Sequence, residues 1–185
     1  MQIKGTAVKV TPIYVKKHYP DKYKDWLNTL PSESRKIMDE PIIATDWYDV
    51  TNAVLLPTRQ IADMFFDGKH TEAALELGKY SAEVALTGVY KIFVMISTPA
   101  FMISRATNIF STYYRPADIK IVDSSKDSAI FEIKQITEPE ALIAWRIAGW
   151  MDHALEIVKK KDVQLDIKSD FTPGNEIVTI TIKWQ

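Results

Sequence analysis

The sequence predicts an α+β fold in which an antiparallel sheet packs against a layer of helices. Residues 137–184 have the pattern of a long apolar helix followed by two short strands. The last strand alternates regularly between two faces, so one face must be covered, and the apolar helix is the best candidate for the cover. Two hairpins from the C-terminal half and one N-terminal strand make up the predicted sheet. The predicted strands are 2–10, 118–123, 129–136, 162–168 and 176–184.

Length and composition indicate one domain, residues 1–185, with a normal core. A chain of this length should bury roughly 70% of the surface that it exposes when unfolded. The 23 basic and 24 acidic residues give a formal net charge of -1, so we expect no general attraction for nucleic acid or anionic membranes. The absence of cysteine excludes a thiol nucleophile, disulfides and thiolate metal sites, and it suits a reducing cytoplasm. No apolar run approaches the roughly 18 residues of a membrane span, so we expect a soluble cytoplasmic protein.

The first half of the chain is predicted to be mainly helical. Gly5 interrupts the opening strand and indicates a bulge or a close approach of another segment. Pro57 should kink or divide the helix that contains it. Gly78 and Gly88 lie on a central helix, where we interpret them as small surfaces that a neighbouring helix can approach closely. The predicted helices cover about 11–19, 21–30, 31–38, 50–66, 71–96 and 97–114.

The usual catalytic signatures are absent. The sequence has no Walker loop, dinucleotide glycine fingerprint, Gly-x-Ser-x-Gly elbow or His-Glu-x-x-His motif. No nucleophile, base and orienting group can be assembled from residue spacing, so no catalytic residue is predicted and an enzyme is not favoured. We interpret His18 and His70 as surface residues. For His153 we favour a partly buried structural role over a role as a ligand. No metal site and no cofactor are predicted, with haem as the alternative because a single histidine can hold it.

Two arginines interrupt apolar helix faces, Arg105 and Arg146. Burying a guanidinium costs several kcal/mol unless the charge is paired. Each side chain should therefore reach solvent, meet a carboxylate or bind an anionic ligand. Exposure to solvent and pairing with a carboxylate are together favoured over an anionic ligand. If either arginine binds a ligand, it is the best indication in the sequence of an anion site.

Aromatic and methionine residues gather in several predicted helices and could line an apolar pocket. Core packing explains the same residues without a ligand, and we weigh it more heavily. These residues are Trp47, Tyr48, Phe65, Phe66, Tyr90, Phe93, Met95, Phe101 and Met102. The residues selected as the candidate ligand-binding set are Trp47, Tyr48, Phe93, Arg105, Arg146 and His153.

Short motifs along nearly the whole chain resemble those of a known family. They are Lys4-Gly5, Trp47-Tyr48, Leu77-Gly78, Gly88-Val89-Tyr90, Tyr113-Tyr114, Gly149-Trp150, Ala154-Leu155-Glu156 and Ile182-Lys183-Trp184. On these motifs the chain resembles a bacterial family of unassigned function, abundant in myxobacteria, that belongs near the 4-vinyl reductase-type, TRAPP-component and haem-NO-binding domains. The resemblance implies a TRAPP-like or haem-NO-binding-like fold, and the TRAPP-like relatives imply a homodimer formed through helices. The Tyr-x-Ser-x-Arg signature of the haem-NO-binding branch is absent from this chain.

These observations together predict a non-catalytic sensor or carrier domain. It would bind a small apolar or amphipathic ligand between the helical layer and the sheet. The first alternative is a homodimeric interaction or scaffold protein without a ligand. A haem or gas sensor is the second alternative.

Overall fold

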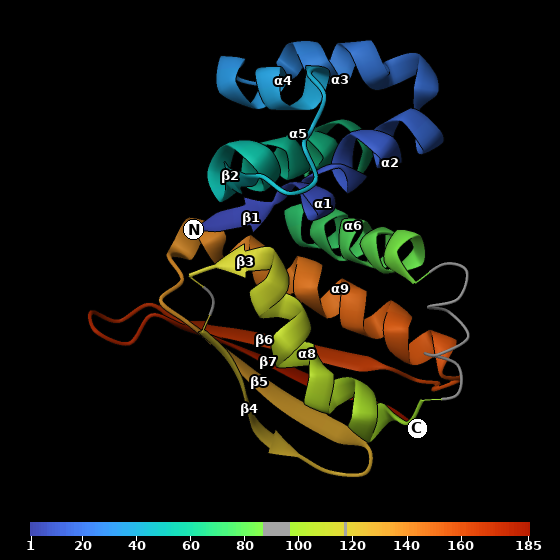
Figure 1. Cartoon of the computed structure of the whole chain (residues 1–185), viewed down its shortest axis with the longest axis vertical. Coiled ribbons are helices and arrows are strands. Elements are labelled where there is room, and N and C mark those ends of the chain that lie inside the picture. Colours follow the sequence, from blue (N-terminus) through green and yellow to red (C-terminus); the bar gives the residue numbers. More distant parts are fainter. Residues whose placement is uncertain (87–96, 117) are drawn as a thin grey trace.

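The computed structural model describes residues 1–86, 97–116 and 118–185, without the side chains of residues 100, 102–106 and 109. The predicted fold class is confirmed, because a stack of helices packs on an antiparallel sheet (Figure 1). No helix in these three ranges is long and apolar enough to cross a membrane.

The main sheet contains four antiparallel strands in the order β4-β5-β7-β6. Its two hairpins correspond to the two predicted in the C-terminal half. The strands are β4 (Asp118–Ser124), β5 (Ser128–Lys134), β6 (Gln164–Asp170) and β7 (Ile177–Lys183). Alternate residues of the central strands are buried, including Phe131 opposite Ile180. The alternation expected for the last strand is therefore confirmed.

The helix α9 (Leu142–Ile157) covers the buried face of this sheet (Figure 1). A short 3-10 turn, η3 (Glu138–Ala141), leads into it. Glu140 accepts hydrogen bonds from the backbone N–H and the hydroxyl of Thr137, at 2.9 and 2.8 Å. This capping box satisfies backbone donors that a helix start leaves unpaired.

Most of the remaining helices lie on the side of α9 that faces away from the main sheet, and they form successive layers (Figure 1). α6 packs on α9, α2 and α5 pack on α6, and α3 and α4 cover the far end. α8 lies beside the main sheet, against β4. The elements are α2 (Val10–His18), η1 (Pro20–Lys22), α3 (Tyr23–Thr29), α4 (Ser32–Asp39), the π-helical turn η2 (Thr51–Leu55), α5 (Leu56–Phe65), α6 (His70–Ala85) and α8 (Pro99–Tyr113).

The N-terminal strand is shorter than predicted and belongs to a different sheet. β1 (Gln2–Lys4) pairs with β2 (Trp47–Asp49) and β3 (Tyr114–Arg115) in a small sheet of order β2-β1-β3. The chain turns into a helix, α1 (Gly5–Val8), where a continuing strand was expected. A Cβ on Gly5 would overlap the carbonyl of Ile43, so the predicted close approach at this glycine is confirmed.

The helix around Pro57 is continuous over residues 50–65, and it changes from the π-helical turn η2 to the α-helix α5 one residue before the proline. Thr98 caps α8 by accepting a hydrogen bond from the N–H of Phe101 at 3.2 Å. The helix predicted for 71–96 is observed to residue 85, and its last part, including Gly88, lies outside the described residues.

Candidate ligand-binding site

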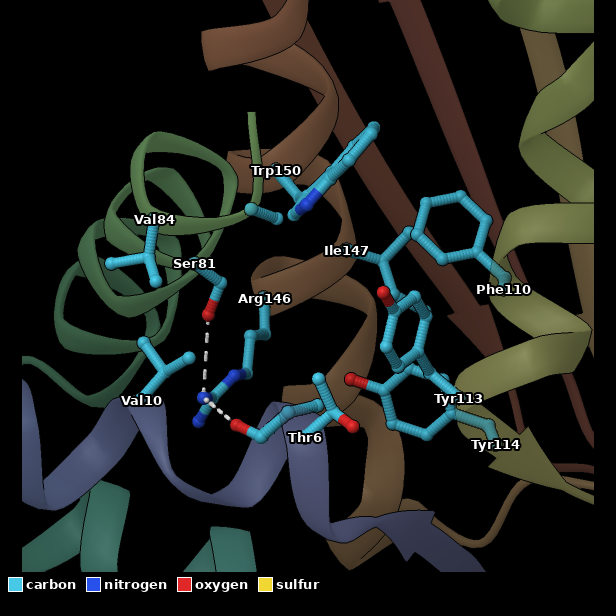
Figure 2. A pocket seen from close by; sticks show the side chains of 12 residues that line it. Thr6, Val10, Ser81, Val84, Phe110, Tyr113, Tyr114, Arg146, Ile147 and Trp150 are labelled. Carbon is cyan, nitrogen blue, oxygen red and sulfur yellow. Dashed lines mark hydrogen bonds between the residues drawn. The ribbon is translucent and has the colours of Figure 1, made fainter. Parts of the chain in front are cut away.

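A cavity of about 210 Å³ lies where α1, α2, α6, α8 and α9 meet (Figure 2). Its walls are mostly apolar, with a few hydroxyl groups and one guanidinium. The lining residues are Thr6, Ala7, Val10, Ser81, Val84, Ala85, Phe110, Tyr113, Tyr114, Arg146, Ile147 and Trp150. A hollow with apolar walls and a few polar groups converging on it is the usual form of a small-molecule site.

Two glycines set one wall of the cavity by bringing α6 and α9 into backbone contact. A Cβ on Gly78 would overlap the carbonyl of Arg146, and a Cβ on Gly149 would overlap the carbonyl of Leu75. The interpretation of Gly78 as a close-packing position is therefore confirmed. The contact places Ser81, one turn after Gly78, against the side chain of Arg146.

Arg146 is the charged residue of the cavity wall. It is 3% exposed, and it interrupts the apolar face of α9 as the sequence indicated. Nη1 donates to Thr11 Oγ1 at 3.2 Å, while Nη2 donates to the carbonyl of Ala7 at 3.4 Å and to Ser81 Oγ at 3.5 Å. Two of these three bonds are longer than the usual N–H···O range of about 2.7–3.2 Å. All three acceptors are neutral oxygens.

The charge of Arg146 has no negative partner among the residues that the structure describes. Three alternatives were open for Arg146: exposure to solvent, an internal ion pair or an anionic ligand. Within the described residues, the structure shows neither exposure to solvent nor an ion pair. Burial lowers the pKa of the guanidinium, although arginine stays protonated at neutral pH. A buried charge without a counter-charge costs several kcal/mol.

Tyr113 and Tyr114 line the cavity on the side opposite Arg146 (Figure 2). The ring of Tyr114 is buried, and its hydroxyl makes no hydrogen bond to a described residue. Burial raises the pKa of this hydroxyl, and the positive charge of Arg146 opposes the rise only in part. Tyr114 is therefore a neutral O–H group at physiological pH, available as a donor to a ligand.

Trp47 and Tyr48 do not line this cavity. The Trp47 ring is stacked against the guanidinium of Arg115 at 4.0 Å, and the Lys4 ammonium lies 5.8 Å from it. The Tyr48 hydroxyl accepts a hydrogen bond from the backbone N–H of Ile43 at 2.9 Å. Both residues thus have partners inside the small sheet and its flanking loop.

His153 also lies away from the cavity, although it is on α9. Its Nδ1 is 3.0 Å from Glu156 Oε2, and about a quarter of its side chain is exposed. His18 stacks on Tyr14 at 4.5 Å, and His70 pairs with Asp63 at 3.1 Å. Within the described residues, no group of three histidine or acidic side chains could hold a metal ion. Phe93 and the side chain of Arg105 lie outside the described part of the chain.

Several cavity residues were not selected from the sequence. Ser81 accepts a hydrogen bond from Arg146, and Tyr114 lies across the cavity from it (Figure 2). Both residues are far from Arg146 along the chain. In the sequence, Tyr113-Tyr114 stands out only as a motif of the family resemblance. A local signal existed for Ser81, because it lies on the same helix face as Gly78, but it did not by itself indicate a ligand.

Comparison with known proteins gives a likeness in structure alone. No family model matches the chain, and no curated protein matches its sequence. The H-NOX protein of K. algicida in the unliganded Fe(II) state is 12% identical, with a TM-score of 0.74 over 99% of this chain and 97% of that one. The S. oneidensis H-NOX protein in the Fe(II)NO state is 10% identical, with a TM-score of 0.72 over 99% of this chain and 99% of that one. This chain has the H-NOX fold.

A third similar structure is the oxygen complex of an oxygen-binding H-NOX domain related to soluble guanylate cyclases. It is 12% identical, with a TM-score of 0.69, and the match covers 99% of this chain and 95% of that one. The haem-NO-binding part of the family resemblance is thus supported at the level of fold. The resemblance to 4-vinyl reductase-type and TRAPP-component domains stays a prediction.

The prediction of no cofactor is corrected by this likeness. The matched H-NOX proteins include Fe(II), Fe(II)NO and oxygen-bound states, and another matched structure concerns the redox potential of haem. That prediction rested on the interpretation of the three histidines as surface or structural residues and on the absent Tyr-x-Ser-x-Arg signature. The signature is local whereas the shared fold spans the chain, so its absence does not support a prediction of no cofactor.

The described cavity residues fit haem only in part. The apolar walls suit a porphyrin ring, and Arg146 suits one of its carboxylates. The described lining offers no histidine, cysteine or methionine to iron, only the hydroxyls of Tyr113 and Tyr114 as oxygen ligands. The volume of about 210 Å³ is also below the roughly 300–1,000 Å³ of common ligand pockets.

Proposed function

We propose that this protein is a non-catalytic sensor or carrier domain that binds a small amphipathic molecule in the cavity beside Arg146. The observation that supports this is a fully buried guanidinium, without a carboxylate partner among the described residues, on the wall of an apolar cavity. Binding of a molecule with an anionic group would supply the missing counter-charge. The H-NOX fold agrees with this function, because the matched H-NOX proteins include ligand-bound states.

The chemistry of the cavity wall favours binding over catalysis. Its described polar groups are hydroxyls and one arginine, and none of these is a base at neutral pH. Ser81 donates its hydroxyl to the carbonyl of Leu77 at 2.8 Å, so it is not activated as a nucleophile. Such a wall can hold and orient a molecule, but it lacks a group to accept a proton from it.

Native mass spectrometry of the protein purified from its own host tests the proposal. We expect a bound mass that is retained under gentle ionisation and is absent from an Arg146→Met variant. An Arg115→Met variant is the matched control, since Arg115 lies outside the cavity lining. Repeated absence of any bound mass from the natural protein would contradict the proposal.

Haem is a specific candidate for this molecule, because the matched structures belong to H-NOX proteins. Titration of the purified protein with hemin would give a saturable Soret band if haem binds in the cavity. Arg146→Met and Tyr114→Phe should then weaken uptake. His153→Ala should leave the band unchanged, because His153 does not line the cavity. Loss of the band in His153→Ala would instead assign iron ligation to that histidine.

Homodimer formation and a cytoplasmic location stay predictions. Sedimentation velocity at micromolar concentration tests the first of these. A single species with the mass of one chain would contradict the homodimer.

A further inference from the structure

We infer that the molecule bound in the cavity is a small monocarboxylate, held by an ion pair with Arg146 and a hydrogen bond from Tyr114. This inference rests on the proposed function and narrows it to one chemical class. It depends on the charge of the cavity, on its unused donors and on its volume.

The charge of the cavity suits one negative charge. Arg146 is the single Lys, Arg or His among the lining residues of the described chain, and no acidic residue accompanies it. A singly charged anion would neutralise it. A phosphate dianion would leave excess negative charge in an apolar space, which is costly.

The number of free donors suits a carboxylate. A guanidinium has five N–H donors, and the three observed bonds leave at least two of them without a partner among the described residues. The Tyr114 hydroxyl adds one donor, and Figure 2 shows it facing Arg146 across the cavity. Two carboxylate oxygens match this small set, because guanidinium binds carboxylate through paired N–H···O bonds. The additional oxygen atoms of a phosphate would be left with few donors.

The volume and walls limit the rest of the molecule. An apolar cavity of about 150 Å³ holds the six carbons of benzene, so about 210 Å³ suits a hydrocarbon part of roughly eight carbon atoms. The side chains of Val10, Phe110, Ile147 and Trp150 provide an apolar surface for its hydrocarbon part. Medium-chain and aryl-substituted monocarboxylates meet both limits, and octanoate and 3-phenylpropanoate are suitable probes.

Isothermal titration calorimetry with octanoate and with octan-1-ol tests the inference on the ligand-free protein. The two probes have the same chain and differ in the charged group. We expect octanoate to bind about 10- to 100-fold more tightly than octan-1-ol, because only octanoate pairs with the guanidinium. The octanoate affinity should also fall below about pH 5, where the free acid becomes protonated.

Variants separate the roles of the two residues. Arg146→Met should reduce the octanoate affinity at least about tenfold, to the level of octan-1-ol, and leave octan-1-ol binding unchanged. Tyr114→Phe should reduce the octanoate affinity about ten- to a hundredfold, because it removes one hydrogen bond to a charged carboxylate. Arg115→Met, the same exchange outside the cavity lining, should have no effect.

The outcomes distinguish this inference from the broader proposal. Equal affinity for the two probes, or octanoate binding that Arg146→Met leaves intact, would overturn the monocarboxylate inference while a ligand-binding cavity remains. Binding of hemin without binding of either probe would also overturn the monocarboxylate inference and leave the ligand-binding cavity. Failure of every probe, together with the absence of a bound mass from the natural protein, would overturn both.

Discussion

Two cations at the contact between α6 and α9 have opposite surroundings. Lys79 on α6 lies with its Nζ 2.7 Å from Asp152 Oδ2 and 3.6 Å from Glu156 Oε1, both on α9. Arg146, also on α9, is more deeply buried and is bonded only to neutral oxygens of Thr11, Ala7 and Ser81. The deeper charge is thus the one without a counter-charge in the described structure.

The difference separates a structural charge from a charge that suits a ligand. The Lys79–Asp152 pair joins two helices, so its attraction stabilises the fold whether or not a ligand is present. The burial of Arg146 destabilises the ligand-free fold, and an anion that binds only the folded state would offset this cost. Substitutions at the two residues should therefore have effects of opposite sign on stability.

The largest effect is expected for the helix contact on which both cations depend. Gly149→Ala places a methyl group against the carbonyl of Leu75 and should force α6 and α9 apart. We expect the free energy of unfolding to fall by about 3 kcal/mol or more, because the obstacle is backbone and cannot rotate away. Urea unfolding followed by circular dichroism measures this loss.

Gly174→Ala is the matched control for that substitution. Gly174 has a φ of +85° with open space around its Cβ position, so alanine should cost only about 1–2 kcal/mol of backbone strain. An equal cost at the two glycines would show that α6 and α9 can separate easily, and both charges would then lose their fixed surroundings.

A smaller loss is expected when the structural cation is removed. Lys79→Met leaves the Asp152 carboxylate, which is 8% exposed as a residue, without its ammonium partner. We expect the free energy of unfolding to fall by about 1–2 kcal/mol, discounted because Lys79 is partly exposed. Lys69→Met is the control, because it removes a lysine from an exposed pair with Glu72. It should change the free energy of unfolding by less than about 0.5 kcal/mol.

The matching substitution at the cavity should have the opposite sign. Arg146→Met removes a buried charge and fills a similar volume, so the ligand-free protein should be unchanged or more stable by up to about 2 kcal/mol. The lost bond to Thr11 limits the gain. Thermal and urea unfolding of the ligand-free protein measure it. A loss above about 2 kcal/mol would mean that Arg146 is mainly a structural residue.

The sequence predicted the elements that have a repeated pattern. Alternation in the last strand and the apolar stripe of α9 extend over many residues, so their faces and packing could be inferred. The small β2-β1-β3 sheet was missed because its strands have two or three residues, too few for a period to be visible. Tyr114 in particular continues a helical pattern and yet pairs with Ile3.

The candidate site was predicted only where its signal was local. Arg146 could be selected because a charge inside an apolar helix is visible in a few neighbouring residues. Its partners could not, since Thr11 is 135 positions away along the chain and is brought close only by packing. Trp47 and Tyr48 were selected for their chemistry, and the fold uses them in the small sheet instead.

The smallest expected effect concerns the pH dependence of the Lys79 pair. Burial alone would lower the pKa of Lys79, but the hydrogen bond and negative charge of Asp152, with Glu156, raise it above its ordinary value. A raised folded-state pKa means that the pair contributes its full stability below about pH 10, the unfolded value. The contribution is lost as the pH rises through the folded pKa, and we expect it to be under about 1 kcal/mol because Lys79 is partly exposed. The difference in unfolding free energy between wild type and Lys79→Met should therefore shrink by up to about 1 kcal/mol above about pH 10, where the lysine of the unfolded chain deprotonates. A constant difference across this range would show that Lys79 stabilises the helix contact through its methylene groups and not through its charge.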